Sequence, residues 1–514
     1  MRKTNLRELK QDLTPEILQD TISEFSGIGT DSRVDLRGQL FWALRGERFD
    51  AHDFLPQAVE KGATGLVVER LPPNWQIWAR NVTVIKVPNT LKALQDFARD
   101  VRRRSGSQVI GITGSNGKTS TKEFTTTLLR RHFKTHSNPG SFNNHFGVPM
   151  NLLSAPPDAQ FIIAELGMNH AGEIEDLCAI CEPDIVLCTM VGTAHIEFLG
   201  SEDKVARAKE EIYRFSRPEA CRIFNLDNRW TQTMWERAEV DYPRARAILT
   251  FTNQVERREA DVFLRVIDKS LRGLRVSGRI GGIGGETLVP LIGGHQLVNL
   301  AAAASLAFGA GLDPRDIWQD LGECRGSWGR MQFLETAREA RVLFDGYNAN
   351  RESMEALFAS LEDLPQATSG GAAQVGAVGT SAVAAPATGK VYAVLAEMRE
   401  LGDSAPAEHE RLGALAARSA PLQYVWFFGP HAADFERGFR SVKNKKTLVI
   451  SDDYKDSLAS QIASMLNPGD LVIVKGSRGM KTERFVELCE PLHFTPVAAL
   501  PPTPDEVKLL LRRS

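Results

Sequence analysis

The sequence lacks three features, each of which would have pointed to a particular environment. Only six of its 514 residues are cysteine, which is few for a disulfide-dense secreted scaffold and suits a reducing compartment. No run of about 18 apolar residues occurs, so no transmembrane helix is expected. The charged N-terminus also lacks the apolar segment of a signal peptide. These absences predict a cytoplasmic protein without membrane insertion.

An excess of charge of one sign is missing as well. Lys and Arg total 62 against 64 Asp and Glu, a formal net charge of −2. Without a global basic field, nothing indicates a nucleic-acid partner. The 42% hydrophobic and 25% charged content is that of an ordinary globular protein. The length predicts about three domains.

Two cysteines have the spacing of a redox or zinc motif, Cys178-Ala-Ile-Cys181. They lie in an amphipathic helical pattern, and neither a second such pair nor paired histidines accompany them. We therefore interpret them as small core residues.

The strongest local signal is a glycine-rich turn between a strand and a helix. Val109, Ile110 and Ile112 form an apolar strand, and Lys118-Thr119 open a helix that runs through Leu129. Glycines let backbone N–H groups surround a phosphate, the helix N-terminus adds positive potential, and Lys and Thr suit phosphate and Mg²⁺. Ile112 stands where the strict motif has its first glycine. The pattern nevertheless predicts an ATP phosphate loop.

Two further strands end in polar residues. Glu165 follows the apolar strand that starts at Phe161, and His195 lies in the loop after the strand that starts at Asp184. In a parallel sheet these strand ends lie beside the phosphate loop, where Mg²⁺ needs oxygen ligands. A metal role is favoured for Glu165, whereas His195 fits a ligand contact and a structural hydrogen bond equally well.

The chain divides into three α/β units. Residues 1–104 read as a small α/β domain, and its Asp31-Ser32-Arg33 turn could bind a diphosphate or be a simple surface turn. Residues 105–328 read as a central P-loop ATPase-like domain with a parallel sheet, decorated by antiparallel hairpins between 262 and 289. Residues 329–514 alternate strands and helices like a Rossmann layer, with a flexible insertion at 366–390.

Together these residues resemble the Mur ligase family over all three domains. The motifs are Asp31-Ser32-Arg33, Thr113-Gly-Ser-Asn-Gly-Lys-Thr119, Asn143-Asn144-x-x-Gly-Val-Pro149, Ala164-Glu165, Ala194-His195, Ala208-Lys209, Gly294-His295-x-x-x-Asn299, Gly329-Arg330, Tyr347-Asn-Ala-Asn350, Met398-x-Glu-Leu-Gly402 and Lys475-Gly-Ser-Arg478. The loop without the first glycine matches the variant typical of this family. Tyr347-Asn-Ala-Asn350 is the most specific element, because the ligase that adds the third peptide residue carries a different motif there.

The resemblance implies roles that spacing alone does not give. ATP would contact Gly114, Ser115, Asn116, Gly117, Lys118, Thr119 and Ser120, with Asn299 at adenine, Arg330 at the γ-phosphate and Asp345 at the ribose. Asp31, Ser32 and Arg33 would hold UDP, and Asn348, Asn350 and Lys475 would bind substrate. Thr119 and Glu165 would hold one Mg²⁺, and His195 with an N-carboxylated Lys209 a second. Lys118, His195 and Lys209 would be the catalytic residues.

Several positions depart from the family pattern. Gly346 and Arg351 stand where the pattern has Asp and Pro, Gln296 and Met190 each replace an Asn, and Ala396-Glu397 replaces Gly-Asp. None of these changes removes a phosphate or metal group. Gly346 and Gln296 bear on ribose and adenine binding.

The resemblance further implies an ATP-dependent ligase of peptidoglycan synthesis that joins D-alanyl-D-alanine to UDP-MurNAc-tripeptide through an acyl phosphate. We expect a monomer. The alternatives are the ligase that adds the third amino acid, a folylpolyglutamate synthase, and a non-catalytic nucleotide-binding protein of the same fold. The Asp31-Ser32-Arg33 domain argues against the folate enzyme, and intact Lys118, Glu165, His195 and Lys209 argue against loss of catalysis.

Overall fold

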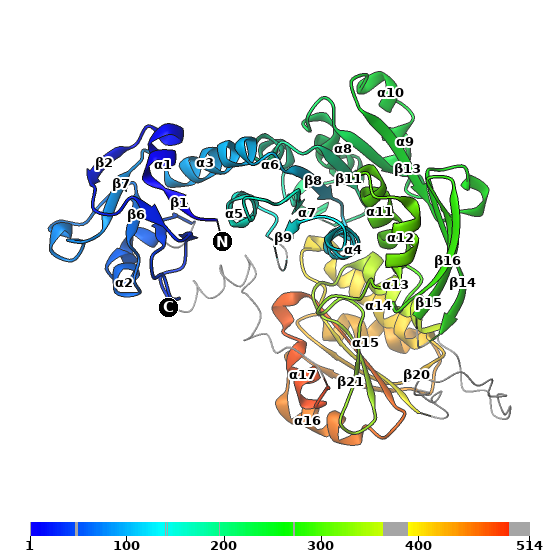
Figure 1. The fold of residues 1–514 in the computed structure, drawn as a ribbon. Helices are drawn as coiled ribbons and strands as arrows, with labels where there is room; N and C mark the ends of the chain where they lie inside the picture. The colour runs from blue at the N-terminus through cyan, green and yellow to red at the C-terminus, as the bar shows by residue number, and fades with distance from the viewer. Residues whose placement is uncertain are drawn as a thin grey trace.

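The computed structural model describes residues 2–46, 50–138, 140, 142–194, 196–270, 273–362 and 389–492. His195 therefore lies outside the described residues, and of the expected insertion at 366–390 only residues 389 and 390 are described. Three α/β parts follow one another along the chain, coloured blue, cyan to green, and yellow to red in Figure 1. The predicted three-part α/β architecture is confirmed.

The first part is built on a five-stranded sheet in the order β2-β7-β6-β5-β4. Strands β4 to β7 pair in parallel and β2 is an antiparallel edge strand. The strands are β2 (Glu16–Gln19), β4 (Ile28–Gly29), β5 (Leu40–Trp42), β6 (Gly65–Val68) and β7 (Thr83–Lys86), and a small pair joins β1 (Thr4–Asn5) to β3 (Glu24–Phe25). The helices are α1 (Leu6–Leu13), α2 (Leu55–Glu60) and α3 (Thr90–Ser105), with 3₁₀ turns η1 (Ala51–Phe54) and η2 (Trp75–Ile77).

Helix α3 joins the first part to the second (Figure 1). Its buried face belongs to a hydrophobic core that contains Trp42 of the first sheet and Val109 of the central one. Near its end, the buried Arg102 side chain donates to the carbonyl oxygens of Cys181 and Glu182 and pairs with Asp184. The first part is thus anchored to the second by packing and by a buried guanidinium.

The central sheet has nine strands in the order β16-β15-β14-β13-β12-β11-β8-β10-β9. From β9 to β14 they are parallel, and β14, β15 and β16 pair antiparallel, as predicted for 262–289. The strands are β8 (Gln108–Thr113), β9 (Thr135–Ser137), β10 (Phe161–Glu165), β11 (Ile185–Cys188), β12 (Cys221–Asn225), β13 (Ala247–Thr252), β14 (Val262–Ser270), β15 (Gly273–Ile280) and β16 (Ile283–Val289).

Helices cover both faces of this sheet, which explains why its parallel strands are almost wholly apolar. Ile110 and Ile112 pack with α4 and α11, whereas Val109 faces the core shared with α3, α5 and α6. The helices are α4 (Lys118–Arg130), α5 (Gly147–Ser154), α6 (Glu173–Cys181), α7 (Ile196–Leu199), α8 (Glu202–Arg214), α9 (Arg229–Trp235), α10 (Ala238–Asp241), α11 (Gln296–Gly309) and α12 (Pro314–Leu321), with the turn η3 (Val255–Arg257).

The Cys178-Ala-Ile-Cys181 pair lies on α6 and both thiols are free and buried. Burial raises the pKa of each thiol, that of Cys181 to about 12. Inert, protonated thiols agree with their interpretation as core residues.

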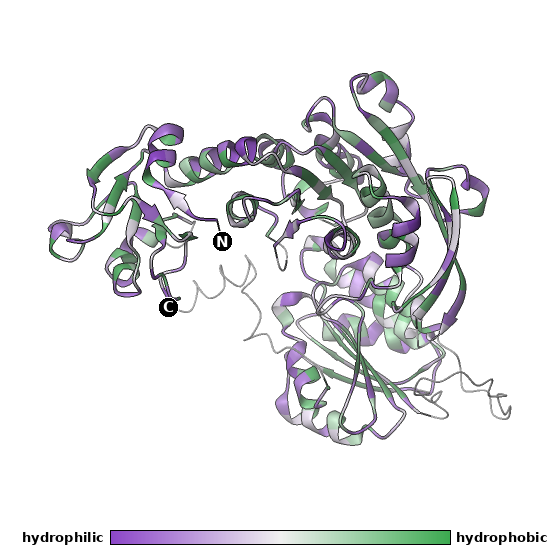
Figure 2. Ribbon diagram, in the orientation of Figure 1, coloured by the Kyte–Doolittle hydropathy of each residue, from purple (hydrophilic) through white to green (hydrophobic). Residues whose placement is uncertain are grey.

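The third part holds a six-stranded sheet in the order β17-β18-β22-β19-β20-β21, parallel except for the edge strand β17. It lies below the central sheet in Figure 1, and the strands of both sheets are largely hydrophobic in Figure 2. The strands are β17 (Gln332–Glu335), β18 (Arg341–Asp345), β19 (Val391–Ala396), β20 (Leu422–Phe428), β21 (Thr447–Ser451) and β22 (Leu471–Lys475). The helices are α13 (Arg351–Glu362), α14 (Ala405–Arg418), α15 (Ala432–Ser441), α16 (Asp456–Met465) and α17 (Glu483–Leu488), with turns η4 (Gly402–Ser404) and η5 (Arg478–Met480).

Among the described residues, no helix combines the length and the apolar character needed to span a bilayer.

Candidate functional site

The predicted phosphate loop connects β8 to the N-terminus of α4, as expected. Gly117 has φ +85°, and a Cβ there would lie 2.1 Å from Asn299 Oδ1. Gly114 has φ +143°, and its Cβ would lie 1.9 Å from Thr189 Oγ1. Both positions therefore require glycine, for conformation and for space. The loop backbone is packed between the exit of β11 and the start of α11.

Lys118 opens α4, and its Nζ donates to the carbonyl oxygen of Gly114 at 2.6 Å. Burial lowers its pKa, while the carboxylate of Glu165 raises it. The loop is further tied to the segment after β11, because Ser115 N donates to Met190 O at 2.8 Å and Gly192 N donates to Ser115 Oγ at 2.9 Å. The Met190 contact uses only backbone atoms, so the departure from Asn leaves it intact.

Glu165 ends β10 beside this loop and is only 3% exposed. Neither carboxylate oxygen accepts a hydrogen bond from any described residue. The nearest cation is the Lys122 Nζ, 3.7 Å from Oε1, which donates at 2.6 and 2.7 Å to the carbonyl oxygens of Asn138 and Gly140. A buried carboxylate that accepts no hydrogen bond is costly, so Glu165 is chemically suited to a divalent cation.

Lys209 on α8 is 1% exposed. Burial, reinforced by the charge of Lys118, lowers its pKa to about 7. In the part of the chain that the structure describes, its ammonium has neither a hydrogen bond nor an ion pair. With a pKa near neutrality, the Lys209 side chain is available at neutral pH as the neutral amine, which is its nucleophilic form.

The four predicted metal ligands are only partly visible. Thr119, Glu165 and Lys209 are described and buried, whereas His195 lies outside the described residues. Within the described ranges, no three His, Cys, Asp or Glu side chains gather in a metal-binding cluster. The predicted set differs from such a cluster because a hydroxyl and a lysine belong to it.

Arg330 and Asn350 of the third part contact the phosphate loop and the start of α4. Arg330 donates to Thr119 Oγ1 at 2.7 Å and stacks 4.1 Å from the ring centroid of Tyr347. Asn350 Nδ2 donates to Asn116 Oδ1 at 2.8 Å. Asn116 and Thr119, which are predicted to bind ATP, thus form hydrogen bonds with two predicted site residues of the third part.

Two residues of this region were missed. Glu352 on α13 accepts from Thr193 N and Oγ1 at 2.9 and 2.6 Å, and Lys122 on α4 is the buried neighbour of Glu165. Lys122 follows Thr119 by three positions, a spacing that places both on one side of a helix. Glu352 carries no signal of its own beyond its place two residues after the Tyr347–Asn350 element.

Asp345, Lys475 and Asn348 form one connected group. The Lys475 Nζ pairs with Asp345 Oδ2 and donates to the carbonyl oxygen of Asn348 at 3.1 Å. Asp345 Oδ1 accepts from Met331 N at 3.1 Å. These three predicted ligand-binding residues lie together, and Lys475 is engaged by its neighbours.

The start of α11 faces the phosphate loop. Asn299 Nδ2 donates to Gln296 Oε1 at 3.0 Å, so the departure at Gln296 orients the residue that would contact adenine. His295 Nδ1 lies 3.2 Å from Ser360 Oγ. Burial lowers the pKa of His295 to about 4, which keeps this imidazole neutral near pH 7.

The Asp31-Ser32-Arg33 turn lies in the first part, between β4 and β5. Arg33 Nε and an η nitrogen donate to the two Asp31 oxygens at 2.8 and 2.7 Å, and Ser32 Oγ donates to Gln57 Oε1 at 3.1 Å. Burial opposes ionisation of Asp31, but the Arg33 hydrogen bonds prevail and lower its pKa. Among the described residues, no hydrogen bond or ion pair joins this turn to the phosphate loop.

The departure at Gly346 has a local physical cause. A Cβ at this position would lie 2.3 Å from Thr482 Oγ1 and 2.4 Å from the Phe344 ring. The space that the family's usual Asp would occupy is therefore filled in this chain.

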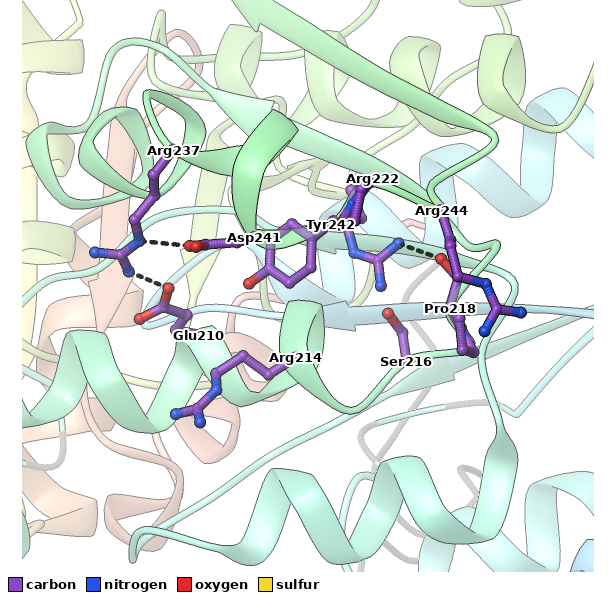
Figure 3. Close-up of a pocket in the computed structure, with 10 residues that line it drawn as sticks. Glu210, Arg214, Ser216, Pro218, Arg222, Arg237, Asp241, Tyr242 and Arg244 are labelled. Carbon is purple, nitrogen blue, oxygen red and sulfur yellow. Dashed lines mark hydrogen bonds and ion pairs between the residues drawn. The ribbon is translucent and has the colours of Figure 1, made fainter.

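A cavity of about 710 Å³ lies elsewhere, at the amino ends of β12 and β13 (Figure 3). Arg237 pairs there with both Glu210 and Asp241, and the Arg222 guanidinium stacks 4.3 Å from the Tyr242 ring centroid. None of the predicted site residues lines this cavity. The candidate site is instead the interface between the phosphate loop and the third part.

Comparison with known proteins identifies the family and the fold. Three family models match in order: "Mur ligase family, catalytic domain" over residues 24–102, "Mur ligase middle domain" over 112–307, and "Mur ligase, glutamate ligase domain" over 371–478. The UDP-N-acetylmuramoyl-tripeptide–D-alanyl-D-alanine ligase of Bacillus subtilis is 31% identical to this chain, over 90% of the chain and 92% of the relative.

Two solved structures are similar over nearly the whole chain. A crystal structure of MurF from Acinetobacter baumannii has a TM-score of 0.79 and 28% identity, covering 95% of this chain and 98% of its own. MurF from Thermotoga maritima, crystallised in complex with ADP, has a TM-score of 0.70 and 26% identity, covering 90% and 97%.

Proposed function

This chain belongs to the Mur ligase family, and from that premise we propose that it joins D-alanyl-D-alanine to UDP-MurNAc-tripeptide in peptidoglycan synthesis, at the expense of ATP. The observation that carries the proposal is the meeting of the phosphate loop with the third part. Arg330 reaches Thr119 and Asn350 reaches Asn116, so the motif predicted to bind the nucleotide and the one predicted to bind substrate lie at one interface.

The reaction proceeds in two steps. The terminal carboxylate of the tripeptide attacks the γ-phosphorus of ATP, ADP leaves, and an acyl phosphate forms. The amine of the dipeptide then attacks the acyl carbon, and inorganic phosphate leaves as the amide bond closes. Carboxylate and triphosphate repel each other, so the site must neutralise charge and align the reactants.

The residues of this chain divide that work. Backbone N–H groups of Gly114 to Thr119 and the N-terminus of α4 cradle the phosphates. Lys118 exchanges its Gly114 carbonyl for phosphate oxygens, whose negative charge favours the protonated ammonium. Arg330, held at Thr119 and stacked on Tyr347, places a guanidinium at the γ-phosphate. The closed interface excludes water from the acyl phosphate.

Mg²⁺ fits the residues present. The two oxygens of the buried Glu165, neither of which accepts a hydrogen bond from a described residue, and the hydroxyl of Thr119 are hard ligands for one ion. We assign His195 and Lys209 to a second ion. A bound Mg²⁺ supplies charge neutralisation and polarises the γ-phosphate. The pKa of about 7 at Lys209 favours the neutral amine, which combines with CO₂ to give a carboxylated, oxygen-donating side chain.

The first part would bind the UDP-linked substrate. Asp31, Ser32 and Arg33 would hold the UDP group, with the Arg33 fork released from Asp31 or shared with the diphosphate. The Asn348–Lys475–Asp345 group would shape the substrate side of the third part. The protein would act as a monomer, since all motifs of the site lie in one chain. It would act in the cytoplasm, where ATP is available.

Phosphate release with different acceptors tests the function. With ATP and UDP-MurNAc-tripeptide, D-alanyl-D-alanine should stimulate release, and single amino acids should not. Stimulation by a single amino acid alone, with UDP-MurNAc-dipeptide as donor, would assign the chain to the ligase that adds the third residue.

A further inference from the structure

Glu352 is the second residue of α13, and its two carboxylate oxygens have different surroundings. Oε1 accepts two hydrogen bonds from Thr193, at 2.9 Å from N and 2.6 Å from Oγ1. Oε2 is buried and has no hydrogen-bond partner among the described residues. The adjacent cation does not neutralise it, because Arg351 points to Glu355 and Glu408 at 3.3 and 3.5 Å.

A buried carboxylate oxygen without a partner is costly, by roughly 1–3 kcal/mol or more. The Thr193 bonds explain why the residue docks on the loop after β11, and the N-terminus of α13 is compatible with an acid. The Thr193 bonds would be served as well by a neutral glutamine, and the attraction of a helix N-terminus for an acid supplies no hydrogen-bond partner for Oε2. The unpaired, charged oxygen is the part that docking leaves unexplained.

The position of this oxygen relates it to the reaction. Ser115 of the phosphate loop bonds to Gly192 at 2.9 Å, and the next residue, Thr193, bonds to Glu352. Two hydrogen bonds therefore connect the Glu352 carboxylate, through Thr193 and Gly192, to Ser115 of the predicted phosphate loop. In the proposed function the central part binds ATP and the first part binds the UDP-linked substrate that carries the carboxylate. The third part, to which Glu352 belongs, remains to bind the acceptor that carries the amine.

We propose that Glu352 Oε2 binds the ammonium group of the acceptor dipeptide, an assignment that rests on the proposed function. The α-amino group of a peptide has a pKa of about 8, so the acceptor arrives mostly as a cation near pH 7. One charge-assisted hydrogen bond to Oε2 would hold the nitrogen beside the loop after β11. Glu352 is thus an acceptor-specificity residue for primary amines.

The variant Glu352→Gln separates docking from ammonium binding. Its amide oxygen can still accept both Thr193 bonds, whereas an NH₂ group replaces the free oxygen and repels the ammonium. The KM for D-alanyl-D-alanine should rise about 10- to 100-fold, as for the loss of a hydrogen bond to a charged group. The KM values for ATP and UDP-MurNAc-tripeptide should change less than about twofold. Glu355→Gln, which removes an exposed carboxylate of the same helix, is the matched control and should leave all three KM values unchanged.

Calorimetry gives a readout that is independent of turnover. In the presence of a non-hydrolysable ATP analogue and the UDP substrate, wild type should bind D-alanyl-D-alanine more tightly than N-propionyl-D-alanine, in which a hydrogen replaces the amine. Glu352→Gln should bind both equally. If Glu352→Gln is active with an unchanged KM for the dipeptide, or instead needs more Mg²⁺, the inference is wrong and the proposed function stands. A wild-type enzyme that does not use the dipeptide overturns the proposed function and the inference with it.

Discussion

Removing the amine of Lys209 should make the apoprotein more stable. The pKa of this buried lysine falls from 10.5 to about 7 on folding, and each pKa unit corresponds to about 1.4 kcal/mol. Keeping the proton on the folded protein therefore costs roughly 4 kcal/mol at pH 7. Lys209→Met fills the same space with an unbranched apolar side chain and should recover most of that free energy.

The sign of the pH dependence follows from linkage. Between pH 7 and 10.5 the unfolded chain keeps the Lys209 proton and the folded protein loses it, so the contribution of Lys209 to wild-type stability rises with pH in that window. The advantage of Lys209→Met should therefore be largest at or below pH 7 and fall to roughly 2 kcal/mol at pH 9. Urea unfolding in CO₂-free buffer with EDTA measures it.

Lys122→Met is the contrasting control for this experiment. Lys122 is equally buried, but its Nζ donates to two carbonyl oxygens and lies 3.7 Å from Glu165. Its removal should destabilise the protein at both pH values. A Lys209→Met variant with wild-type stability, or with a gain that does not change between pH 7 and 9, would refute the reasoning.

Three further perturbations have defined outcomes. Lys118→Ala should lower ligation about 100- to 1,000-fold, because removing one group that stabilises transition-state charge has that effect. Full ATP-dependent ligation by this variant in a product assay would contradict the mechanism. Gly117→Ala should weaken ATP binding at least about tenfold, measured by calorimetry, since φ is +85° and the new Cβ would overlap Asn299 Oδ1. Wild-type affinity for ATP in this variant would show that the loop does not bind ATP. Gly346→Asp should destabilise the protein by about 1–3 kcal/mol in a melting experiment, because Thr482 and Phe344 fill the space. Adding Thr482→Ala to this variant should restore part of the lost stability.

The parts of the fold that could be predicted are those specified locally. The strand, glycine turn and Lys118 helix start form a contiguous pattern, and the apolar strand before Glu165 places that carboxylate at the same sheet edge. The alternation of strands and helices in residues 329–514 likewise predicts the mainly parallel sheet of the third part. The edge strand β17 and the strands β9, β12 and β13 were not predicted.

The contacts across the interface could not be predicted from local pattern. Arg330 and Thr119 are 211 positions apart in the chain, and only the placement of the third part against the central sheet joins them. Lys122 looks like a solvated helix lysine in the sequence, yet the loop that contains Asn138 covers it. The special status of Lys209 came from family resemblance, and its burial supplies the physical reason.

Oxygen transfer tests the central claim most directly. UDP-MurNAc-tripeptide labelled with ¹⁸O in its terminal carboxylate is incubated with ATP, Mg²⁺, D-alanyl-D-alanine and the enzyme, and the products are analysed by mass spectrometry. An acyl phosphate predicts one ¹⁸O in each inorganic phosphate released and the other ¹⁸O in the new amide. Amide product accompanied by unlabelled phosphate, or no amide at all, would contradict the account.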